Sequence, residues 1–257
     1  LFGVALKAVG ENGKPLQLTF ERLNEVILKL VTMLIELAPY GVFSLLLTLF
    51  AVQGIGVIGD LAKYFFLLVF VLIFHGIVTY GLFLSLLAKL NPITFFSKLR
   101  SLAVFAFSTS SSSATMPITL QTVRTKLGVK PSIGSFTVPL GATVNMDGTA
   151  IMQGIATVFI AQAYNMDLTT MDYLMVILTA TLASIGTAGV PGVGLIMLAM
   201  VLEQVGLPVE GIALIIGVDR LLDMTRTAVN VCGDAMVSCV VAKSEGEFDK
   251  EVFDKRI

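Results

Sequence analysis

Long uncharged stretches, interrupted by short polar segments, run through most of this chain. Residues 64–88 form 25 uncharged positions rich in Phe, Leu and Val, and residues 173–202 form thirty more. Because a helix of about 20 apolar residues crosses a bilayer, we interpret these stretches as membrane-spanning helices. Residues 37–59 form a further uncharged stretch, in which Pro39 and Gly41 predict a kink of the kind that neighbouring helices in a membrane tolerate.

The composition of the chain supports the same class. Hydrophobic residues make up 56% of the 257 residues and charged residues only 14%, whereas soluble domains carry about 25% charged residues. The formal net charge of −1 and the lack of a Lys/Arg cluster exclude a nucleic-acid-binding surface. We therefore predict an all-α polytopic membrane protein that has the lipid bilayer as a partner and does not bind nucleic acid.

The two ends of the chain differ from its middle. Residues 1–10 are typical of the end of a hydrophobic helix, and residues 16–36 are amphipathic, as in an interfacial helix or the charged entrance of a span. The chain begins without Met or a signal pattern, which suggests a fragment of a longer polypeptide. Residues 243–257 are charged, and we expect this tail to be solvated and frayed.

The uncharged stretch at residues 101–123 is interrupted in its middle by the hydroxyl residues 108–113. A straight span would not place six hydroxyls in a row there. A re-entrant helical hairpin over residues 92–127 would, because its non-helical tip is tolerated where it lines a cavity. The alternative is a serine-rich linker outside the membrane, which we disfavour because the flanking arms are too short to span alone.

A single charge, Asp147, lies near the middle of the span predicted over residues 132–162. Asn145, Gly148 and Thr149 surround it, which predicts an unwound helix that offers carbonyls and a carboxylate to a hard cation. The alternative is a single buried aspartate that only accepts hydrogen bonds.

The second uncharged stretch is also interrupted in its middle. Four glycines and a proline fall within residues 186–194, which favours a second re-entrant hairpin over residues 170–206 rather than one long span. In the helix predicted over residues 212–242, six polar side chains share an arc of roughly 100°. They are Asp219, Asp223, Arg226, Thr227, Asn230 and Asp234.

The polar arc could be the wet face of a soluble bundle, but its neighbours are spans. Ionisable groups inside a span usually face a binding site or a water-filled cavity. The order hairpin then broken helix (92–127, 132–162) recurs as hairpin then polar helix (170–206, 212–242). An odd number of crossings in each unit predicts an inverted repeat, and such repeats place the substrate at the middle of the membrane.

The remaining reactive residues indicate no further chemistry. Cys232 and Cys239 would lie roughly 10 Å apart on one helix, too far for a disulfide. We interpret the only histidine, His75, as a neutral packed or interfacial residue rather than a ligand or proton relay. The serine run could serve an intramembrane hydrolase only with a base in reach, and His75 lies in another, unbroken span. We therefore do not expect an enzyme.

Four motifs in order resemble the glutamate transporter family, the dicarboxylate/amino acid:cation symporters. They are Ser111-Ser112-Ser113 with Thr115-Met116-Pro117, Asn145-Met146-Asp147-Gly148-Thr149, Ser184 to Gly192, and Asp223 to Asp234. The resemblance covers nearly the whole chain and implies two hairpin tips that meet over an amino-acid site. It also implies a transport domain that moves like an elevator against a trimeric scaffold. The inverted repeat is already described for a member of this family, so it is not an independent finding.

The resemblance implies a substrate site for an acidic amino acid. Arg226 would bind the side-chain carboxylate, for which its planar fork is suited. Asp223, helped by Thr227, would bind the ammonium, and Asn230 the α-carboxylate. The remaining implied contacts come from backbone or hydroxyl groups of Ser112, Thr149, Val190 and Gly194.

The resemblance also implies sodium as the coupling ion, with no other cofactor. Side-chain oxygens would come from Asn145, Asp147 and Asp234. Mostly carbonyl oxygens would come from Gly141, Thr143, Ser184, Ile185, Thr187 and Asn230. All are oxygen ligands, as a hard cation needs. Asp219 is expected to support the site from behind.

The chain departs from the family pattern at two positions. Ser110 and Met224 stand where members bring a second arginine to the site, which puts counter-transport and the charge balance of Asp223 in doubt. The family's third helix, which contributes to one cation site, is also missing.

The resemblance divides the chain into scaffold-type helices, a transport domain and a charged tail. The predicted bounds are 1–59 for the scaffold helices, 60–243 for the transport domain and 244–257 for the tail. Within the transport domain they are 60–90 (span), 92–127 (hairpin 1), 132–163 (broken helix), 170–206 (hairpin 2) and 210–243 (polar helix).

We predict a sodium-coupled symporter of aspartate or glutamate, assembled as a homotrimer in a prokaryotic plasma membrane. A proton-coupled glutamate carrier is the nearest alternative, since the same carboxylates could titrate. A C4-dicarboxylate symporter is a further alternative. It is disfavoured because a C4-dicarboxylate has no ammonium group for Asp223 to bind. Arg226 disfavours a carrier of neutral amino acids.

Overall fold

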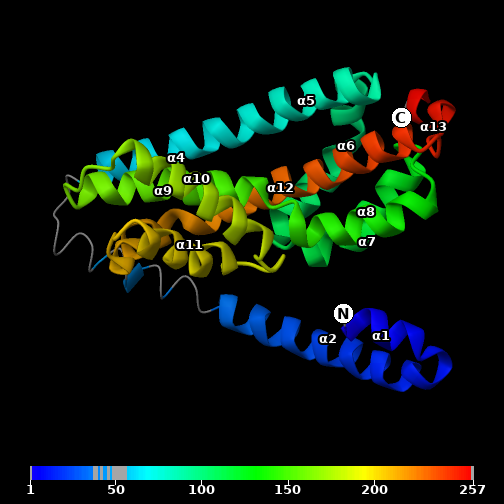
Figure 1. Ribbon diagram of the computed structural model, residues 1–257, viewed down its shortest axis with the longest axis horizontal. Coiled ribbons are helices and arrows are strands. Elements are labelled where there is room, and N and C mark those ends of the chain that lie inside the picture. Colours follow the sequence, from blue (N-terminus) through cyan, green and yellow to red (C-terminus); the bar gives the residue numbers. More distant parts are fainter. Residues whose placement is uncertain (1, 37–39, 41–42, 45–46, 48–56, 256–257) are drawn as a thin grey trace. The chain divides into compact units, whose positions relative to one another are not determined.

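The computed structural model describes residues 2–36, 40, 43, 44, 47 and 57–255. It divides into two compact units, Leu1–Ala51 and Val52–Ile257. Helices form nearly all of the described residues, with one isolated bridge between Val129 and Phe248 (Figure 1). The predicted all-α class is therefore confirmed for this part of the chain.

The smaller unit contains a short helix and a long amphipathic one. Helix α1 (Phe2–Ala8) leads through a 3₁₀ turn (Gly10–Gly13) into α2 (Lys14–Glu36). These elements agree with the predicted hydrophobic and amphipathic segments. The kinked span predicted over residues 37–59 lies largely outside the described residues.

The larger unit begins with one long helical rod, which includes α4 (Val57–Phe74) and α5 (Tyr80–Phe83). Two π-helical turns, His75–Thr79 and Leu84–Ala88, interrupt the α-helical hydrogen bonding. The rod is therefore less regular than the unbroken span predicted there. Single π turns are frequent at functional sites, and the first of these turns begins at the only histidine of the chain.

The first interrupted stretch folds into two pairs of helices. Helix α6 (Pro92–Thr109) starts with Asn91 as its N-cap and Pro92 at its first position, as helix starts favour. It is joined to α7 (Ser112–Thr125) at Ser110, where φ is 50°. Helices α8 (Pro131–Val144) and α9 (Asp147–Ala163) then follow, separated by Asn145 and Met146. Both predicted interruptions are confirmed as breaks between helices.

The second interrupted stretch repeats this order. Helix α10 (Thr170–Ile185) opens with a capping box between Thr169 and Asp172. It is followed by a glycine-rich connection and α11 (Val193–Gln204). A 3₁₀ turn (Val209–Gly211) leads into α12 (Ile212–Ser244).

Helix α12 is the centre of the larger unit (Figure 1). It contacts α4, α6, α7, α8, α9 and α11. Its predicted polar face points into the protein, because Asp219, Arg226, Asn230 and Asp234 are buried while Leu221 is exposed. The interpretation of this face as the wet side of a soluble bundle is therefore wrong.

The tail is solvated as expected, since most of residues 243–255 are exposed, but the expectation that it is frayed is wrong. The last residues form helix α13 (Lys250–Asp254), and the Phe253 side chain is buried. Its backbone is held by the buried Lys98 of α6, whose Nζ donates to the carbonyl of Val252 at 2.8 Å. The Phe253 ring is buried without removing the charged side chains around it from water, because such side chains still reach the solvent.

A glycine lets the tail approach the turn between α7 and α8. Gly128 has φ of +77° and accepts a hydrogen bond from the Asp249 amide at 2.7 Å. A Cβ at this position would overlap the Asp249 carbonyl. The Lys130 amide in turn donates to the carbonyl of Glu247 at 3.1 Å.

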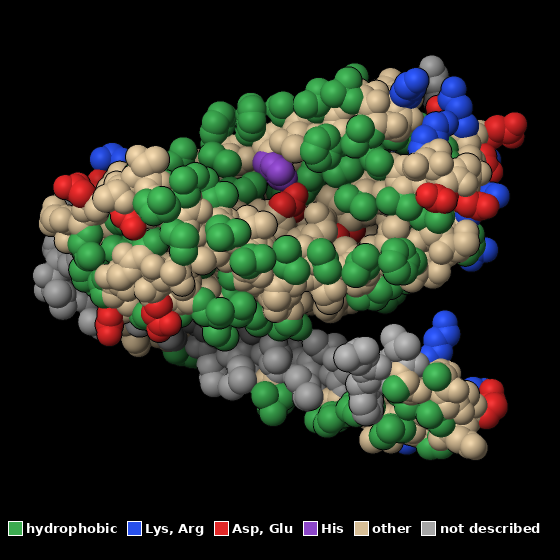
Figure 2. Space-filling view, viewed as in Figure 1, with side chains coloured by type: hydrophobic (Ala, Val, Ile, Leu, Met, Phe, Trp, Pro, Cys, Tyr) green, Lys and Arg blue, Asp and Glu red, His purple; other side chains and the backbone are tan. Residues whose placement is uncertain are grey.

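The surface of the larger unit has the distribution expected for a bilayer protein. On the face that Figure 2 shows, charged side chains gather mostly at the two ends of its long axis, with hydrophobic side chains between them. Among the described residues, the continuous helix Gly59–Ala88 is long and apolar enough to cross a membrane by itself. Helices α10 and α11 are apolar but shorter.

Candidate functional site

Arg226 lies at the centre of a buried cluster of charges. Its guanidinium donates through Nη1 to Asp219 Oδ1 at 2.7 Å and through Nη2 to Asp219 Oδ2 at 3.3 Å. Nη2 also donates to Asp223 Oδ1 at 2.8 Å. Only 1% of the Arg226 side chain is exposed. The fork of this arginine is therefore held by two carboxylates in a medium where charge pairing is strong.

The cluster has two aspartates for one arginine. Asp219, expected to support the site from behind, is the partner that Arg226 engages with both of its terminal nitrogens. The second oxygen of Asp223 accepts a hydrogen bond from the Gly192 amide at 3.2 Å. Asp223 thus links α12 to the connection between α10 and α11, beside the predicted contacts Val190 and Gly194.

The two helix connections meet next to this cluster. The Ser113 amide and the Ser111 hydroxyl both donate to the carbonyl of Gly189, at 3.1 and 2.7 Å. A Cβ at Gly189 would lie 2.9 Å from the Ser113 hydroxyl and 2.9 Å from the Ala142 carbonyl. Glycine is therefore required for this close approach, and the neighbouring Ser112 is buried. The connection between α6 and α7 is thus hydrogen-bonded to the connection between α10 and α11.

A second polar cluster lies where α8 ends and α9 begins. Asn145 Nδ2 donates to Asp234 Oδ1 at 2.9 Å and to the carbonyl of Asn230 at 3.1 Å. The Gly148 amide donates to Asn230 Oδ1 at 2.8 Å. Carbonyl, amide and carboxylate oxygens are the ligands of a hard cation. Gly141 packs directly on Asp234, where a Cβ would overlap the carboxylate.

Asp147 is held by two residues that the sequence reading did not place there. Its Oδ2 lies 2.6 Å from His75 Nε2 and accepts a hydrogen bond from the Tyr80 hydroxyl at 2.5 Å. The Gly148 amide donates to Oδ1 at 3.1 Å. His75 is therefore a hydrogen-bond partner of Asp147, a contact that its interpretation as a packed or interfacial residue did not include. No local spacing signals this contact, because the residues are 72 positions apart.

The remaining predicted cation ligands are less closely joined. Thr143 is exposed, and its hydroxyl donates to the Leu140 carbonyl at 3.0 Å. Ser184 and Thr187 are buried at the end of α10, where the Thr187 amide donates to the Ser184 carbonyl at 3.1 Å. Ile185 is exposed. Helices α8 and α10 are in contact, but no hydrogen bond between described residues links Thr143 to this group.

The predicted contacts Thr149 and Thr227 are buried beside the arginine cluster. Thr149 Cγ2 would lie 3.1 Å from a Cβ at Gly194, which itself would lie 3.7 Å from Arg226 Nη2. Thr227 follows Arg226 on α12. The structure thus brings Asp223, Thr149 and Gly194 close to Arg226.

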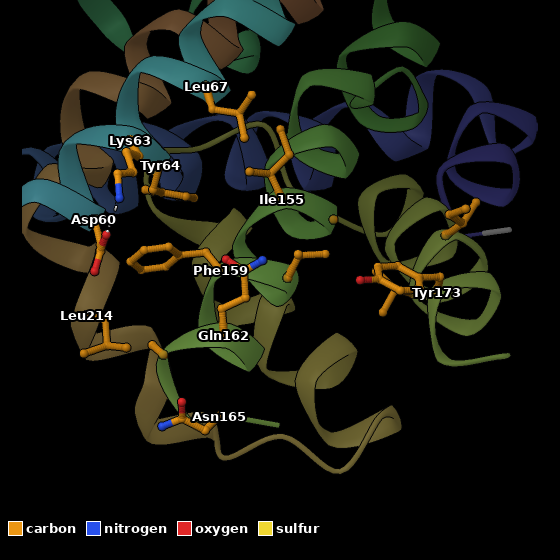
Figure 3. A pocket seen from close by; sticks show the side chains of 15 residues that line it. Asp60, Lys63, Tyr64, Leu67, Ile155, Phe159, Gln162, Asn165, Tyr173 and Leu214 are labelled. Carbon is orange, nitrogen blue, oxygen red and sulfur yellow. Dashed lines mark hydrogen bonds and ion pairs between the residues drawn. The ribbon is translucent and has the colours of Figure 1, made fainter. Parts of the chain in front are cut away.

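A cavity of about 950 Å³ opens elsewhere in the larger unit, between α4, α9, α10 and the start of α12 (Figure 3). Its walls are mainly apolar, with Asp60, Lys63, Gln162 and Asn165 among its polar members. None of the predicted site residues lines it. Arg226 and Asp219 are instead buried, whereas 13% of the Asp223 side chain is exposed. Cys232 and Cys239 are both free, as predicted.

Comparison with known proteins identifies related chains. The chain matches the sodium:dicarboxylate symporter family over residues 1–244. Excitatory amino acid transporter 1 of Rattus norvegicus is 40% identical over 242 residues, which are 93% of this chain and 45% of that protein. The proton/sodium-glutamate symport protein of Bacillus subtilis is 36% identical over 249 residues, 97% of this chain and 58% of that protein.

A third relative is also named as a symporter of glutamate. The proton/glutamate-aspartate symporter of Escherichia coli is 38% identical over 252 residues, 98% of this chain and 57% of that protein. The chain spans about half the length of the curated relatives it matches.

Proposed function

Because the chain belongs to the sodium:dicarboxylate symporter family, we propose that it carries the binding site of a sodium-coupled transporter of acidic amino acids. The family and these relatives are membrane transporters and not enzymes. The observation that carries the proposal is the buried Arg226, held by two carboxylates directly beside the meeting point of the two helix connections.

Substrate binding exchanges one ion pair for two. In the structure, Arg226 Nη2 and Asp223 Oδ1 neutralise each other at 2.8 Å. An amino acid with a side-chain carboxylate offers that carboxylate to Arg226 and its ammonium to Asp223. Asp219 keeps its hold on the guanidinium during the exchange, which preserves the orientation of the fork. Asn230, Thr227, Thr149 and the backbone near Ser112, Val190 and Gly194 supply the remaining contacts.

The charge of the site favours cation coupling. The carboxylates Asp147, Asp219, Asp223 and Asp234 outnumber the single guanidinium, and an acidic amino acid adds a further negative charge. Burying unbalanced charge at bilayer depth is expensive. Sodium ions on the oxygen groups around Asn145, Asp147 and Asp234 offset this charge, so substrate and cation bind together. No other cofactor takes part.

In the proposed transport cycle, different parts of the chain have different roles. Each of the helix pairs α6–α7 and α10–α11 forms a re-entrant hairpin, which enters and leaves the bilayer on the same side. Because the repeat is inverted, the two hairpins enter from opposite sides. Residues 60–243 form the transport domain, which moves like an elevator against scaffold helices that include residues 1–59. The complete protein is a homotrimer in a prokaryotic plasma membrane.

Uptake of labelled aspartate by the complete polypeptide in proteoliposomes tests the proposal. Sodium and proton gradients are imposed separately, with glutamate, succinate and alanine as competitors. We expect uptake that needs sodium, that glutamate blocks and that alanine does not. Competition by succinate but not by glutamate would assign the protein to dicarboxylates and remove the ammonium role of Asp223.

A proton-coupled carrier is the second candidate, because the name of the Escherichia coli relative gives protons alone and that of the Bacillus subtilis relative gives both protons and sodium. It keeps the same substrate site and replaces sodium by protons on the same carboxylates. Uptake driven by a proton gradient without sodium would select this candidate and overturn the cation ligands.

A further inference from the structure

The cavity between α4, α9 and α10 is polar at one end. Its polar lining residues come from the first two turns of α4 and α10, from the end of α9 and from the residues just after it. They are Asp60, Lys63, Gln162, Asn165 and Tyr173. The Tyr64 and Phe159 rings, with centroids 5.0 Å apart, bring the start of α4 next to the end of α9. Asp60, Gln162 and Asn165 therefore lie at the same end of the cavity, below Leu67 and Ile155 in Figure 3.

The rest of the cavity is apolar and deep. Its apolar lining residues include Leu67, Ile155, Val158, Val176 and Ile177. Gly154 also lines it and precedes Gln162 on α9 by about 12 Å, at 1.5 Å of rise per residue. Helix α4 begins at one of the two charged ends of the larger unit (Figures 1 and 2). Since half of a bilayer's hydrocarbon core is about 15 Å thick, the cavity extends from a membrane surface through most of one leaflet.

The space beside Gly154 is large enough for a ligand. A Cβ at this position would meet no atom within 4 Å, although the residue lies inside helix α9. The whole cavity measures about 950 Å³, and ligand pockets measure about 300–1,000 Å³. Protein interiors contain few voids larger than a water molecule. A cavity of this size with mainly apolar walls therefore favours an occupant with a large apolar part.

The charges at the polar end match a zwitterion. Lys63 Nζ lies 2.9 Å from Asp60 Oδ1, and these side chains are 82% and 64% exposed. Exposed ion pairs of this kind are weak, so each member can exchange its partner for an opposite charge on a ligand. A ligand with one phosphate and one ammonium satisfies both. The amides of Gln162 and Asn165 and the Tyr173 hydroxyl can donate hydrogen bonds to phosphate and ester oxygens.

We propose that the cavity binds a phospholipid of the surrounding bilayer. The zwitterionic headgroup lies at Asp60 and Lys63, and one acyl chain extends past Gly154. The chain enters from the side, because Leu67 and Ile177 on the cavity wall are 52% and 65% exposed and belong to the apolar surface of the unit. The proposal does not rest on the proposed function, because no residue of the substrate or cation sites lines the cavity.

Native mass spectrometry of the complete polypeptide counts the lipids that it retains. The probe is phosphatidylethanolamine, at a collision energy that strips loosely held lipids. Gly154→Leu fills the deep end of the cavity, so we expect one retained lipid fewer per protomer. Gly59→Leu is the matched control, because a Cβ there also meets nothing within 4 Å in a helix but lies outside the cavity lining. An equal count in the wild type and a folded Gly154→Leu variant, or an equal loss in the control, overturns the proposal.

Two variants at the polar end leave the apolar walls intact. Asp60→Asn removes the partner of the ammonium. It should lower the binding of phosphatidylethanolamine relative to phosphatidylglycerol, which has no ammonium, by about two- to fivefold. Lys63→Gln removes the partner of the phosphate and should weaken both lipids. Asp167→Asn, exposed and outside the cavity lining, should leave the ratio unchanged. An unchanged ratio in Asp60→Asn overturns the proposal, whether or not Gly154→Leu folds.

A cryo-electron-microscopy map of the complete polypeptide in phosphatidylethanolamine nanodiscs locates the lipid directly. Elongated density beside Gly154 that ends at Lys63 supports the proposal. Another segment of the polypeptide in the cavity, or ordered water alone, overturns it. If the wild type binds neither aspartate nor glutamate, the proposed function fails, while the map still decides whether the lipid is there.

Discussion

The substitution Gly141→Ala tests whether Asp234 is a cation ligand. A Cβ at position 141 would lie 2.9 Å from Cγ and 3.3 Å from Cβ of Asp234. Carbon atoms in contact lie about 3.5–4.0 Å apart, so the carboxylate must retreat by roughly 0.6–1 Å. The retreat also lengthens the 2.9 Å hydrogen bond from Asn145 to Asp234.

The expected change in the free energy of unfolding combines two opposing effects, and the expected change in sodium affinity follows from a third. Alanine is favoured over glycine in a helix by about 1 kcal/mol, whereas overpacking costs about 1–3 kcal/mol. The free energy of unfolding should therefore fall by about 0–2 kcal/mol. Displacing an ionised oxygen ligand costs about 1.5–3 kcal/mol, so sodium affinity should fall roughly 10- to 100-fold.

A sodium titration of aspartate binding to the complete polypeptide measures this effect. Gly154→Ala is the matched control, because a Cβ there meets nothing within 4 Å and the residue also lies inside a helix. The control should leave the sodium midpoint unchanged. An unaltered midpoint in a folded Gly141→Ala variant would remove Asp234 from the cation site.

Three further outcomes are expected. Arg226→Cys should abolish aspartate transport, because it removes the buried fork proposed to bind the side-chain carboxylate; serine and alanine uptake is measured alongside. Unchanged aspartate affinity would contradict the assignment, and the exposed Arg124→Cys is the control. Asp223→Ala should lose amino-acid uptake, and surviving glutamate uptake would contradict the ammonium role. Phe253→Ala should cost about 3 kcal/mol and speed amide exchange at residues 244–254, whereas the exposed Phe136→Ala should not; equal exchange rates would argue against the docked tail.

Periodicity and the placement of charges were enough to predict the helices and their interruptions. Long uncharged stretches, the serine run at 108–113 and the glycines at 186–194 are local features, and helix formation depends mainly on local sequence. The inward polar face of α12 is also local, since residues seven positions apart lie two turns apart on one side of a helix. Asp219 and Arg226 are such a pair.

Contacts between distant segments could not be predicted in this way. His75 and Tyr80 meet Asp147 across 72 and 67 positions, and Lys98 binds the tail across 154. No spacing rule connects such residues, because the packing of whole helices around α12 decides which side chains face each other. The sequence by itself determined the helices, their breaks and the inward chemistry of α12. Only the tertiary structure decided the partners of each buried charge, because an ion pair in a low-dielectric interior forms wherever packing brings its members together.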